Sequence, residues 1–316
     1  MTRYRNLVLF VALAALWGSA FMAIKAGLDY FPPVLFAAVR YDVAGVLMLG
    51  YAVYVLDDPF PRGRDQWAVV AVGAVLLIAA YHALLFVGET DPAVNSATAA
   101  VIVSLSPVLT TGFARAFLPD QRLTLAGVAG LLLGLVGVAV LTGADLGAAV
   151  SGGAVAKLLV LAAAAAFALG SVLTRRIDAD LPIESMEAWS MLGGALLMHL
   201  LSVGLGESVA AAEWTNPTAL AALLFLAVGS SAVGFLIYFD LLERLGAVEI
   251  NLVSYVAPVF AALTGWLFLQ EAPTPGTVVG FCLIFGGFLL IKRDAIRDEL
   301  PRVRRVAFRV RTLFSR

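Results

Sequence analysis

Long apolar runs separated by short polar breaks constrain this chain more than any other feature. Each run has about 20 residues, the length that an α-helix needs to cross a bilayer core about 30 Å thick. The runs lie at approximately 7–28, 34–56, 66–88, 93–114, 123–142, 155–174, 183–204, 217–239, 246–268 and 276–292. Turn residues fill the breaks, as in YFPP, DDPFPRGRD and QEAPTP. The sequence therefore predicts an all-α integral membrane protein with ten transmembrane helices, or nine if one run is re-entrant.

The composition agrees with a protein that lives in lipid. Hydrophobic residues make up 61% of the 316 positions and charged residues only 14%, against about 25% charged in soluble domains. The net charge of −1 gives no indication of a nucleic-acid partner. The single cysteine, Cys282, lies in an apolar run and has no internal disulfide partner. The basic start MTRYRN also fits a signal peptide, but the length of the first run and Lys25, where cleavage would occur, favour a retained helix.

The distribution of positive charge predicts the orientation in the membrane. The arginines of the breaks all fall on one side of a ten-helix topology: Arg3, Arg5, Arg62, Arg64, Arg115, Arg122, Arg175, Arg176 and Arg244. Because cytoplasmic loops carry the excess of lysine and arginine, we expect a multi-pass protein of the cell membrane with both termini in the cytoplasm. Lys25, Arg40 and Lys157 depart from this pattern, and Lys157 is near enough to the outer surface to reach water.

The chain also resembles itself at an offset of about 150 residues. LSPVLTTGFARAFLPD (105–120) aligns with VAPVFAALTGWLFLQE (256–271), which pairs Pro107 with Pro258 and Asp120 with Glu271. Five helices in each half would place the halves in opposite orientations, the inverted repeat of many secondary transporters. We therefore divide the chain into a first five-helix repeat (1–148), a second (149–294) and a basic tail (295–316). Apolar residues at helical spacing in the tail predict an amphipathic cytoplasmic helix on the anionic leaflet.

Several segments resemble the EamA-type members of the drug/metabolite transporter superfamily. They are WGSAFMAIKAG, PPVLFAAVRYDVAG, the run from LSPVLTTGFARAFLPD to LVGVAVL, and YVAPVFAALTGWLFLQEAPTPGTVVGFCLIFGGFLLI. The resemblance implies a central cavity lined by helices 1, 3, 4, 6, 8 and 9, flanked by helices 2 and 7, with helices 5 and 10 peripheral. It also implies a transporter, since many relatives export amino acids or other metabolites. Trp17 stands where related small multidrug exporters carry a buried glutamate, which disfavours an organic-cation substrate.

Charged residues inside the apolar runs are the first candidates for function, because they usually face a bundle interior or a wet cavity. Arg40 lies about seven residues past Pro33, roughly 10 Å below the outer surface. It either pairs with a carboxylate such as Asp29 or Glu89 or binds substrate. Lys25 either reaches the outer surface or binds substrate above Trp17 and Phe21, which share its helix face. Asp42 is nearer the midplane and either bonds a neighbouring helix or carries the coupling ion.

Polar residues and prolines on other helices complete the predicted site. His82 either relays protons or is a satisfied hydrogen-bond partner, beside Tyr81, and His199 is expected at the membrane interface. Ser104 and Pro107 repeat part of a stripe on the ninth run, where a proline either lines a pathway or only bends the helix. The predicted substrate-binding residues are Trp17, Phe21, Lys25, Arg40, Tyr81, His82, Ser104, Pro107, Asn251, Ser254, Tyr255 and Pro258, with Asp42 as the ion-coupling candidate.

Missing motifs narrow the class of activity. The chain has no phosphate-binding loop of the Gly-x-x-x-x-Gly-Lys-[Ser/Thr] type, no His-Glu-x-x-His zinc motif and no Gly-x-Ser-x-Gly elbow. We therefore expect no enzyme activity, cofactor or metal, but a secondary transporter that exports a small polar metabolite or amino acid by alternating access. The alternatives are a membrane-embedded or lipid-modifying enzyme and a non-transporting scaffold or receptor. GLLLG (130–134) fits either packing within the chain or a homodimer, so both monomer and homodimer remain open.

Overall fold

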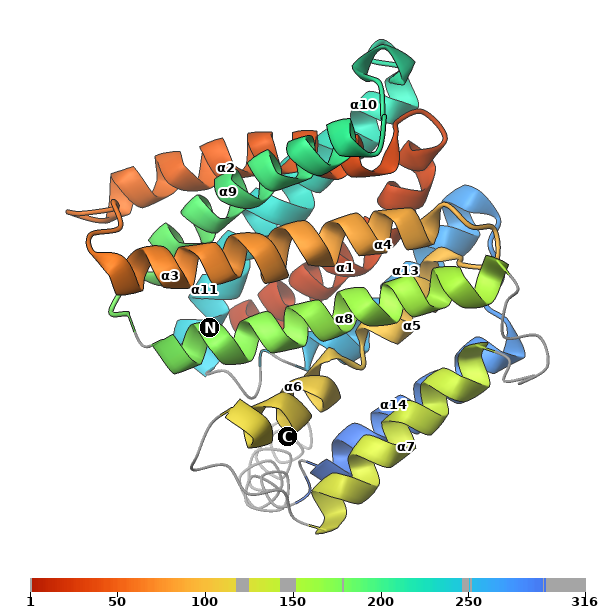
Figure 1. The fold of residues 1–316 in the computed structure, drawn as a ribbon. Helices are drawn as coiled ribbons and strands as arrows, with labels where there is room; N and C mark the ends of the chain where they lie inside the picture. Colours follow the sequence, from red (N-terminus) through yellow and green to blue (C-terminus); the bar gives the residue numbers. More distant parts are fainter. Residues whose placement is uncertain are drawn as a thin grey trace, which may run out of the picture.

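The computed structural model describes residues 2–117, 125–142, 152–177, 179–245, 250, 252–291 and 293, and these residues form helices and short connections (Figure 1). The predicted amphipathic tail (295–316) lies outside the described residues. The helices are α1 (Thr2–Leu28), α2 (Pro33–Val55), α3 (Arg64–Val72), η1 (Gly73–Ala80), α4 (Tyr81–Glu89), α5 (Ser96–Val103), α6 (Ser106–Phe117), α7 (Leu125–Thr142), α8 (Gly152–Ile177), α9 (Ile183–Gly204), η2 (Val209–Ala211), α10 (Pro217–Leu224), η3 (Phe225–Val233), α11 (Gly234–Leu245), α13 (Val253–Leu269) and α14 (Pro275–Ile291).

Prolines and capping side chains set the helix starts. α2 begins at Pro33, where the missing proline N–H costs nothing. The Glu207 carboxylate accepts hydrogen bonds from the next two backbone N–H groups, at 3.1 and 2.8 Å. The side chains of Asn95 and Asn216 cap α5 and α10 in the same way. These caps place the starts within a few residues of the predicted positions.

Seven helical segments of the described chain are long and apolar enough to cross a membrane. They are Arg5–Leu28, Pro33–Val55, Arg64–Glu89, Ser96–Phe117, Gly153–Ile177, Ile183–Gly204 and Pro217–Leu245. Three shorter apolar helices, Leu125–Val140, Val253–Leu269 and Pro275–Leu290, fall in the remaining predicted runs. The chain is therefore a multi-pass membrane protein.

Three of the crossing segments are not regular α-helices, which the sequence did not predict. η1 and η3 are π-helical stretches inside the third and eighth predicted helices. The fourth predicted helix is broken at Ser104 and Leu105, between α5 and α6. π-Turns and breaks are rare and gather at functional sites. Pro107 sits in the first turn of α6 and cannot donate to the preceding turn, which agrees with the position of the break.

The broadest packing joins helices from different halves of the chain: α7 with α14, α2 with α9 and α1 with α13. In Figure 1, α7 and α14 lie side by side at one edge of the bundle, away from α2 and α9. Glycines permit the α7–α14 approach, since a Cβ on Gly287 would collide with the Gly130 carbonyl and one on Gly137 would come within 2.8 Å of the Gly280 carbonyl. The GLLLG sequence is therefore used for packing within the chain.

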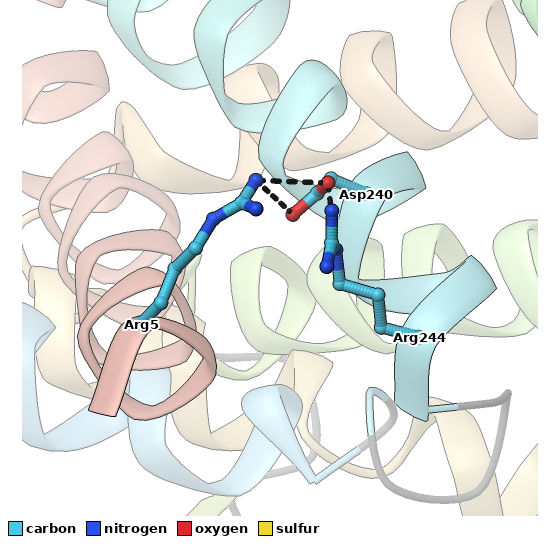
Figure 2. A network of polar contacts seen from close by, with 3 residues as sticks. All are labelled: Arg5, Asp240 and Arg244. Atoms are coloured by element: carbon cyan, nitrogen blue, oxygen red, sulfur yellow. Dashed lines mark hydrogen bonds and ion pairs between the residues drawn. The ribbon is translucent and has the colours of Figure 1, made fainter. Parts of the chain in front are cut away.

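The bundle has two chemically different ends. The basic end carries Arg5, Arg62, Arg64, Arg115, Arg175, Arg176 and Arg244 together with carboxylates such as Asp58, Asp65 and Asp240, whereas the acidic end carries Asp29, Glu89, Asp91, Glu207, Glu213 and Glu271. Figure 2 shows a link at the basic end, where Arg5 of α1 and Arg244 of α11 both reach Asp240, at 3.2 and 2.9 Å. Asp240 therefore ties α1 to α11.

Candidate functional site

A cavity of about 550 Å³ lies between the two halves. Its walls come from α1, α2, the α3–η1–α4 segment, the α5–α6 segment, α8, α9, the η3–α11 segment and α13, with Phe288 of α14. At the basic end the lining reaches Arg175 in the last turn of α8 and Ile183 in the first turn of α9. None of the described loop residues at the acidic end lines the cavity. The cavity therefore extends toward the basic end and stops short of the acidic end.

Arg40 lines this cavity and is 5% exposed. Its Nε and Nη2 both donate to the Ser231 hydroxyl, at 3.2 and 3.1 Å, and its guanidinium lies 4.9 Å from the Tyr41 ring centroid. No carboxylate of the described residues lies within ion-pair distance of it, so neither Asp29 nor Glu89 is its partner. A guanidinium has five N–H donors. Arg40 thus brings a buried positive charge, with donors to spare, to the cavity wall.

His82 is a satisfied hydrogen-bond partner within the same wall. Its Nδ1 lies 2.9 Å from the Ile78 carbonyl oxygen, which can only accept, so Nδ1 carries a proton. Its Nε2 lies 2.7 Å from the Tyr41 hydroxyl. The Tyr81 ring packs edge-on against the His82 ring, with centroids 4.4 Å apart. These contacts fix the orientation of Tyr41 and His82, and all four residues line the cavity.

An aromatic wall faces these polar groups. The Trp17 ring lies 5.9 Å from the Phe235 ring and 5.5 Å from the Tyr238 ring, and its Nε1 donates to the Ser230 carbonyl at 3.2 Å. Phe21, one turn farther along α1, also lines the cavity. The prediction that Trp17 and Phe21 share a ledge therefore agrees with their position on the cavity wall.

Glu187 is a cavity residue that sequence reasoning missed. It lies in α9, is 9% exposed and lines the cavity. No donor of the described residues lies within hydrogen-bond distance of its carboxylate. Glu187 and Arg40 are both near enough to Tyr41 to act on it electrostatically. The signal was available: Glu187 is a carboxylate inside the apolar run 183–204, which is the criterion that selected Arg40.

The break in the fourth predicted helix and the start of α13 also contribute polar groups to the site. Ser104, at the break, and Pro107, in the first turn of α6, both line the cavity. Ser254 lines it from α13. Pro258, inside α13, has no N–H to give to the Ser254 carbonyl four residues earlier. Pro258 itself is buried and does not line the cavity, and Asn251 lies outside the described residues.

Lys25 lies outside the cavity. Its Nζ donates to three backbone carbonyls at the acidic end, those of Glu89 (2.7 Å), Asp91 (3.0 Å) and Val94 (3.1 Å). An ammonium group has three N–H donors, so all of them are used. Lys25 therefore holds the α4–α5 connection against α1, and its contacts favour a structural role over substrate binding.

Two more predicted residues lie away from the cavity. Asp42 forms a 2.7 Å contact with His199 Nε2, which joins α2 to α9, with 47% of the Asp42 side chain exposed. This is the bond to a neighbouring helix that was one of its two predicted roles. Tyr255 is buried against Phe285 and Phe288 of α14, with ring centroids 5.5 and 4.3 Å away. Both residues stabilise contacts between helices rather than line the cavity.

Comparison with known proteins adds the family. The sequence model of the EamA-like transporter family matches residues 5–143 and again residues 155–293. The chain belongs to the EamA-like transporter family. It is 28% identical to the uncharacterized transporter YvbV of Bacillus subtilis over 92% of each chain. It is 31% identical to the uncharacterized inner membrane transporter YedA of Escherichia coli, over 83% of this chain and 84% of YedA.

Two further relatives bear on substrate and fold. A probable terminal-alkyne amino-acid exporter of Streptantibioticus cattleyicolor is 29% identical over 89% of this chain and 91% of its own length. A solved crystal structure matches with a TM-score of 0.65 and 27% identity, over 94% of this chain and 99% of the other. YvbV and YedA are named as transporters and the Streptantibioticus cattleyicolor protein as an exporter, which places this EamA-like protein in a family of transporters rather than enzymes.

The cavity of this EamA-like transporter departs from what the resemblance implied. The second and seventh predicted helices, α2 and α9, were expected only to flank the cavity. They instead supply its buried Arg40 and Glu187. These helices pack on each other across the two halves, so the charges come from the α2–α9 side of the bundle.

Proposed function

We propose that this EamA-like transporter exports a small zwitterionic metabolite, such as an amino acid, through the described cavity. Arg40 binds the anionic group of the substrate and Glu187 binds its cationic group. The observation that carries the proposal is a buried guanidinium and a buried carboxylate on one cavity wall, neither paired with an opposite charge of the described residues. Buried charges are costly without a partner, and a bound zwitterion supplies both partners.

The aromatic wall sets the shape of the substrate. Trp17, Phe235 and Tyr238 offer apolar ring surface beside the charged groups, which suits an apolar or aromatic side chain. A cavity of about 550 Å³ falls within the range of small-molecule sites. A packed scaffold has no need of such a space. The amino-acid exporter among the relatives supports the same substrate class.

Alternating access explains the two different ends. In our proposal the chain has ten transmembrane helices in two inverted five-helix halves, 1–148 and 149–294, with the basic end in the cytoplasm. The double match of the family model supports two related halves. The cavity then extends toward the cytoplasm and is closed to the outside by the contacts of Lys25 and of the Glu207 cap. Rocking of one half against the other would exchange these ends.

Proteoliposome transport tests the proposal. A panel of radiolabelled amino acids, simple carboxylates and simple amines is assayed for export with wild-type protein, and we expect amino acids to be transported best. Loss of one charge-assisted contact costs about 1.5–3 kcal/mol, so Arg40→Gln and Glu187→Gln should each weaken binding roughly tenfold to a hundredfold. Arg40→Lys should recover only part, because a point charge does not reproduce a planar fork.

A matched control separates binding from folding. Arg62→Gln removes a guanidinium whose only described partner is the exposed Asp58 at the basic end, and it should transport like wild type. If Arg40→Gln transports normally but melts much earlier, Arg40 is a structural residue and the substrate role falls. If simple carboxylates are transported as well as amino acids and Glu187→Gln has no effect, the substrate is an anion and not a zwitterion.

A further inference from the structure

Glu89 is the most poorly compensated charged group of the described residues. It ends α4, is fully buried, and neither of its carboxylate oxygens has a hydrogen-bond partner. Lys25 is the cation that contacts this residue: its Nζ donates to the Glu89 backbone carbonyl at 2.7 Å. Lys25 gives its other two donors to the carbonyls of Asp91 and Val94. The side chain of Glu89 is thus beside an ammonium group that is fully occupied elsewhere.

Other elements packed around Glu89 do not neutralise it either. Charged groups near enough to act on its carboxylate include Lys25 of α1, Arg40 of α2 and Glu271, which follows α13. Arg40 donates to Ser231, and Glu271 is a second negative charge that accepts from the Ser96 N–H at 2.9 Å. α8 packs on the neighbouring glycine of α4 through apolar Val160. Burial without a hydrogen-bond partner favours the neutral, protonated form of this carboxyl group.

The position of Glu89 places it at the closed end of the cavity. His82 and Leu85 line the cavity from α4, and Glu89 follows on the same face at spacings of seven and four residues. Ile24 lines the cavity from α1, and Lys25 is the next residue. Glu89 and Lys25 therefore lie between the cavity and the acidic end. We name the Lys25 contacts to the 89–94 segment the outer seal.

We propose that Glu89 is the proton-binding site that couples this transporter to the proton gradient, and that its proton state controls the outer seal. With the proton on a Glu89 oxygen, Lys25 stays on the three carbonyls and the seal is closed, as in this structure. When the proton leaves to water in the cavity, the Glu89 carboxylate becomes the strongest acceptor beside Lys25 and draws the ammonium from the carbonyls of Asp91 and Val94. The 89–94 segment is then released and the acidic end opens.

The cycle gives export against inward proton flow. In the open state a proton from outside water binds Glu89, frees Lys25 to return to the carbonyls and closes the seal over the emptied cavity. The proton then passes to the cytoplasmic side. One proton therefore enters the cell each time the outer seal opens and closes. This inference depends on the proposed transport function for its physiological meaning, but the seal and its proton can be measured without any substrate.

Infrared spectroscopy tests the proton directly. Purified protein in liposomes at neutral pH is compared in H₂O and D₂O for the C=O stretch of a protonated carboxyl group. We expect this band to be larger in wild type than in Glu89→Gln by one carboxyl group, and unchanged in Glu213→Gln, which alters a carboxylate at the same end that accepts from Asn216. Equal bands in wild type and Glu89→Gln would overturn the proposal. If Glu89→Gln does not fold, Glu89→Asp should shift the band, and an unshifted band would overturn it equally.

Cysteine accessibility tests the seal. In a Cys282→Ser background, Ser96→Cys places a thiol at a fully buried position behind the 89–94 segment, and Pro273→Cys places one at an exposed position of the same end. The rate of labelling by an impermeant maleimide from outside is expressed as the ratio of the first to the second, which cancels the pH dependence of thiol chemistry. We expect the ratio to rise severalfold from acid to alkaline pH, and to stay low at every pH when Glu89→Gln is added.

Two results would overturn the proposed control of the outer seal by Glu89. One is a labelling ratio that still depends on pH after Glu89→Gln is added. The other is a ratio that does not change with pH in the protein that retains Glu89. Failure here leaves the zwitterion proposal standing, because Arg40 and Glu187 lie inside the cavity and are tested by substrate binding. Conversely, an inactive Arg40→Gln variant should keep a labelling ratio that rises with pH, with its midpoint moved to higher pH because one cation near Glu89 is removed.

Discussion

Replacing Lys25 by methionine should destabilise the acidic end of the protein. The change keeps the length and apolar stem of the side chain but removes three hydrogen bonds to the carbonyls of Glu89, Asp91 and Val94. Hydrogen bonds to a charged group contribute about 1.5–3 kcal/mol each. The three share one charge and lie at the end of the bundle, where water can replace part of them, so their sum is smaller than three times one bond. We expect a loss of about 3 kcal/mol, the value of one strong bond.

Thermal unfolding in detergent measures this loss. Since 1 kcal/mol corresponds to about 2–4 °C for chains of 150–250 residues, Lys25→Met should melt roughly 6–12 °C below wild type. Lys25→Arg should melt in between, because it keeps the charge but not three donors at one point. Asp29→Asn is the control, since Asp29 is exposed at the same end of α1 and makes no described contact. It should melt with wild type.

The opposite pattern would refute the structural reading of Lys25. If Lys25→Met melts with wild type but no longer transports, its ammonium contacts substrate in another conformation, as the sequence alone had predicted. A protein that melts early and still transports, more slowly, would fit the contacts of the structure.

Three further predictions concern packing and orientation. Gly287→Val should lower the melting temperature by an amount equal to about 1–3 kcal/mol, because its side chain would collide with α7, whereas Gly286→Ala, whose Cβ would make only ordinary contact, should melt with wild type. His199→Ala should destabilise the protein by about 1 kcal/mol or less, since its partly exposed aspartate partner on α2 loses its only described contact; an unchanged melting curve would show that water already satisfies that aspartate. In a cysteine-free background, Pro273→Cys should react with an impermeant thiol reagent from outside and Asp65→Cys should not, and the reverse result would overturn the orientation.

The helices themselves were largely predictable, because hydropathy and prolines determine where a membrane helix can begin and end. The runs 34–56 and 183–204 correspond to α2 (Pro33–Val55) and α9 (Ile183–Gly204). The π-helical stretches were not predictable, since η1 is uniformly apolar and its wide turns depend on tertiary packing. The break before α6 was predictable only in part. Pro107 indicated a disturbance of the helix, but a proline alone does not distinguish a bend from a break.

The cavity was predictable in part. Trp17, Phe21, Arg40, Tyr81 and His82 all line it, because a polar or aromatic residue at the right depth has few other places to go in a membrane helix. Depth along one helix does not say which neighbour a long side chain reaches. Lys25 shows this limit, since its four-carbon stem carries the ammonium past the cavity to the 89–94 segment.

Asp42 and Glu187 also show that the depth of a residue along its helix does not predict whether it lines the cavity. Asp42 was selected for its depth, but its face of α2 meets His199 of α9. Glu187 lies near the start of the run 183–204, is a carboxylate like Asp42, and lines the cavity. Which face of a helix meets the cavity is fixed by helix packing between halves, and one sequence contains that information only as weak glycine patterns such as Gly130 and Gly287.

The packing of α7 on α14, α2 on α9 and α1 on α13 has a consequence for how the protein is made. Each of these pairs joins residues separated by about 150 positions or more, so none can form until the second half has left the ribosome and entered the bilayer. The first five helices must wait in lipid with their glycine faces uncovered, and long-range contacts of this kind form slowly. Two separately synthesised halves would face the same wait, and they should assemble in the membrane into a complete bundle that neither can build alone.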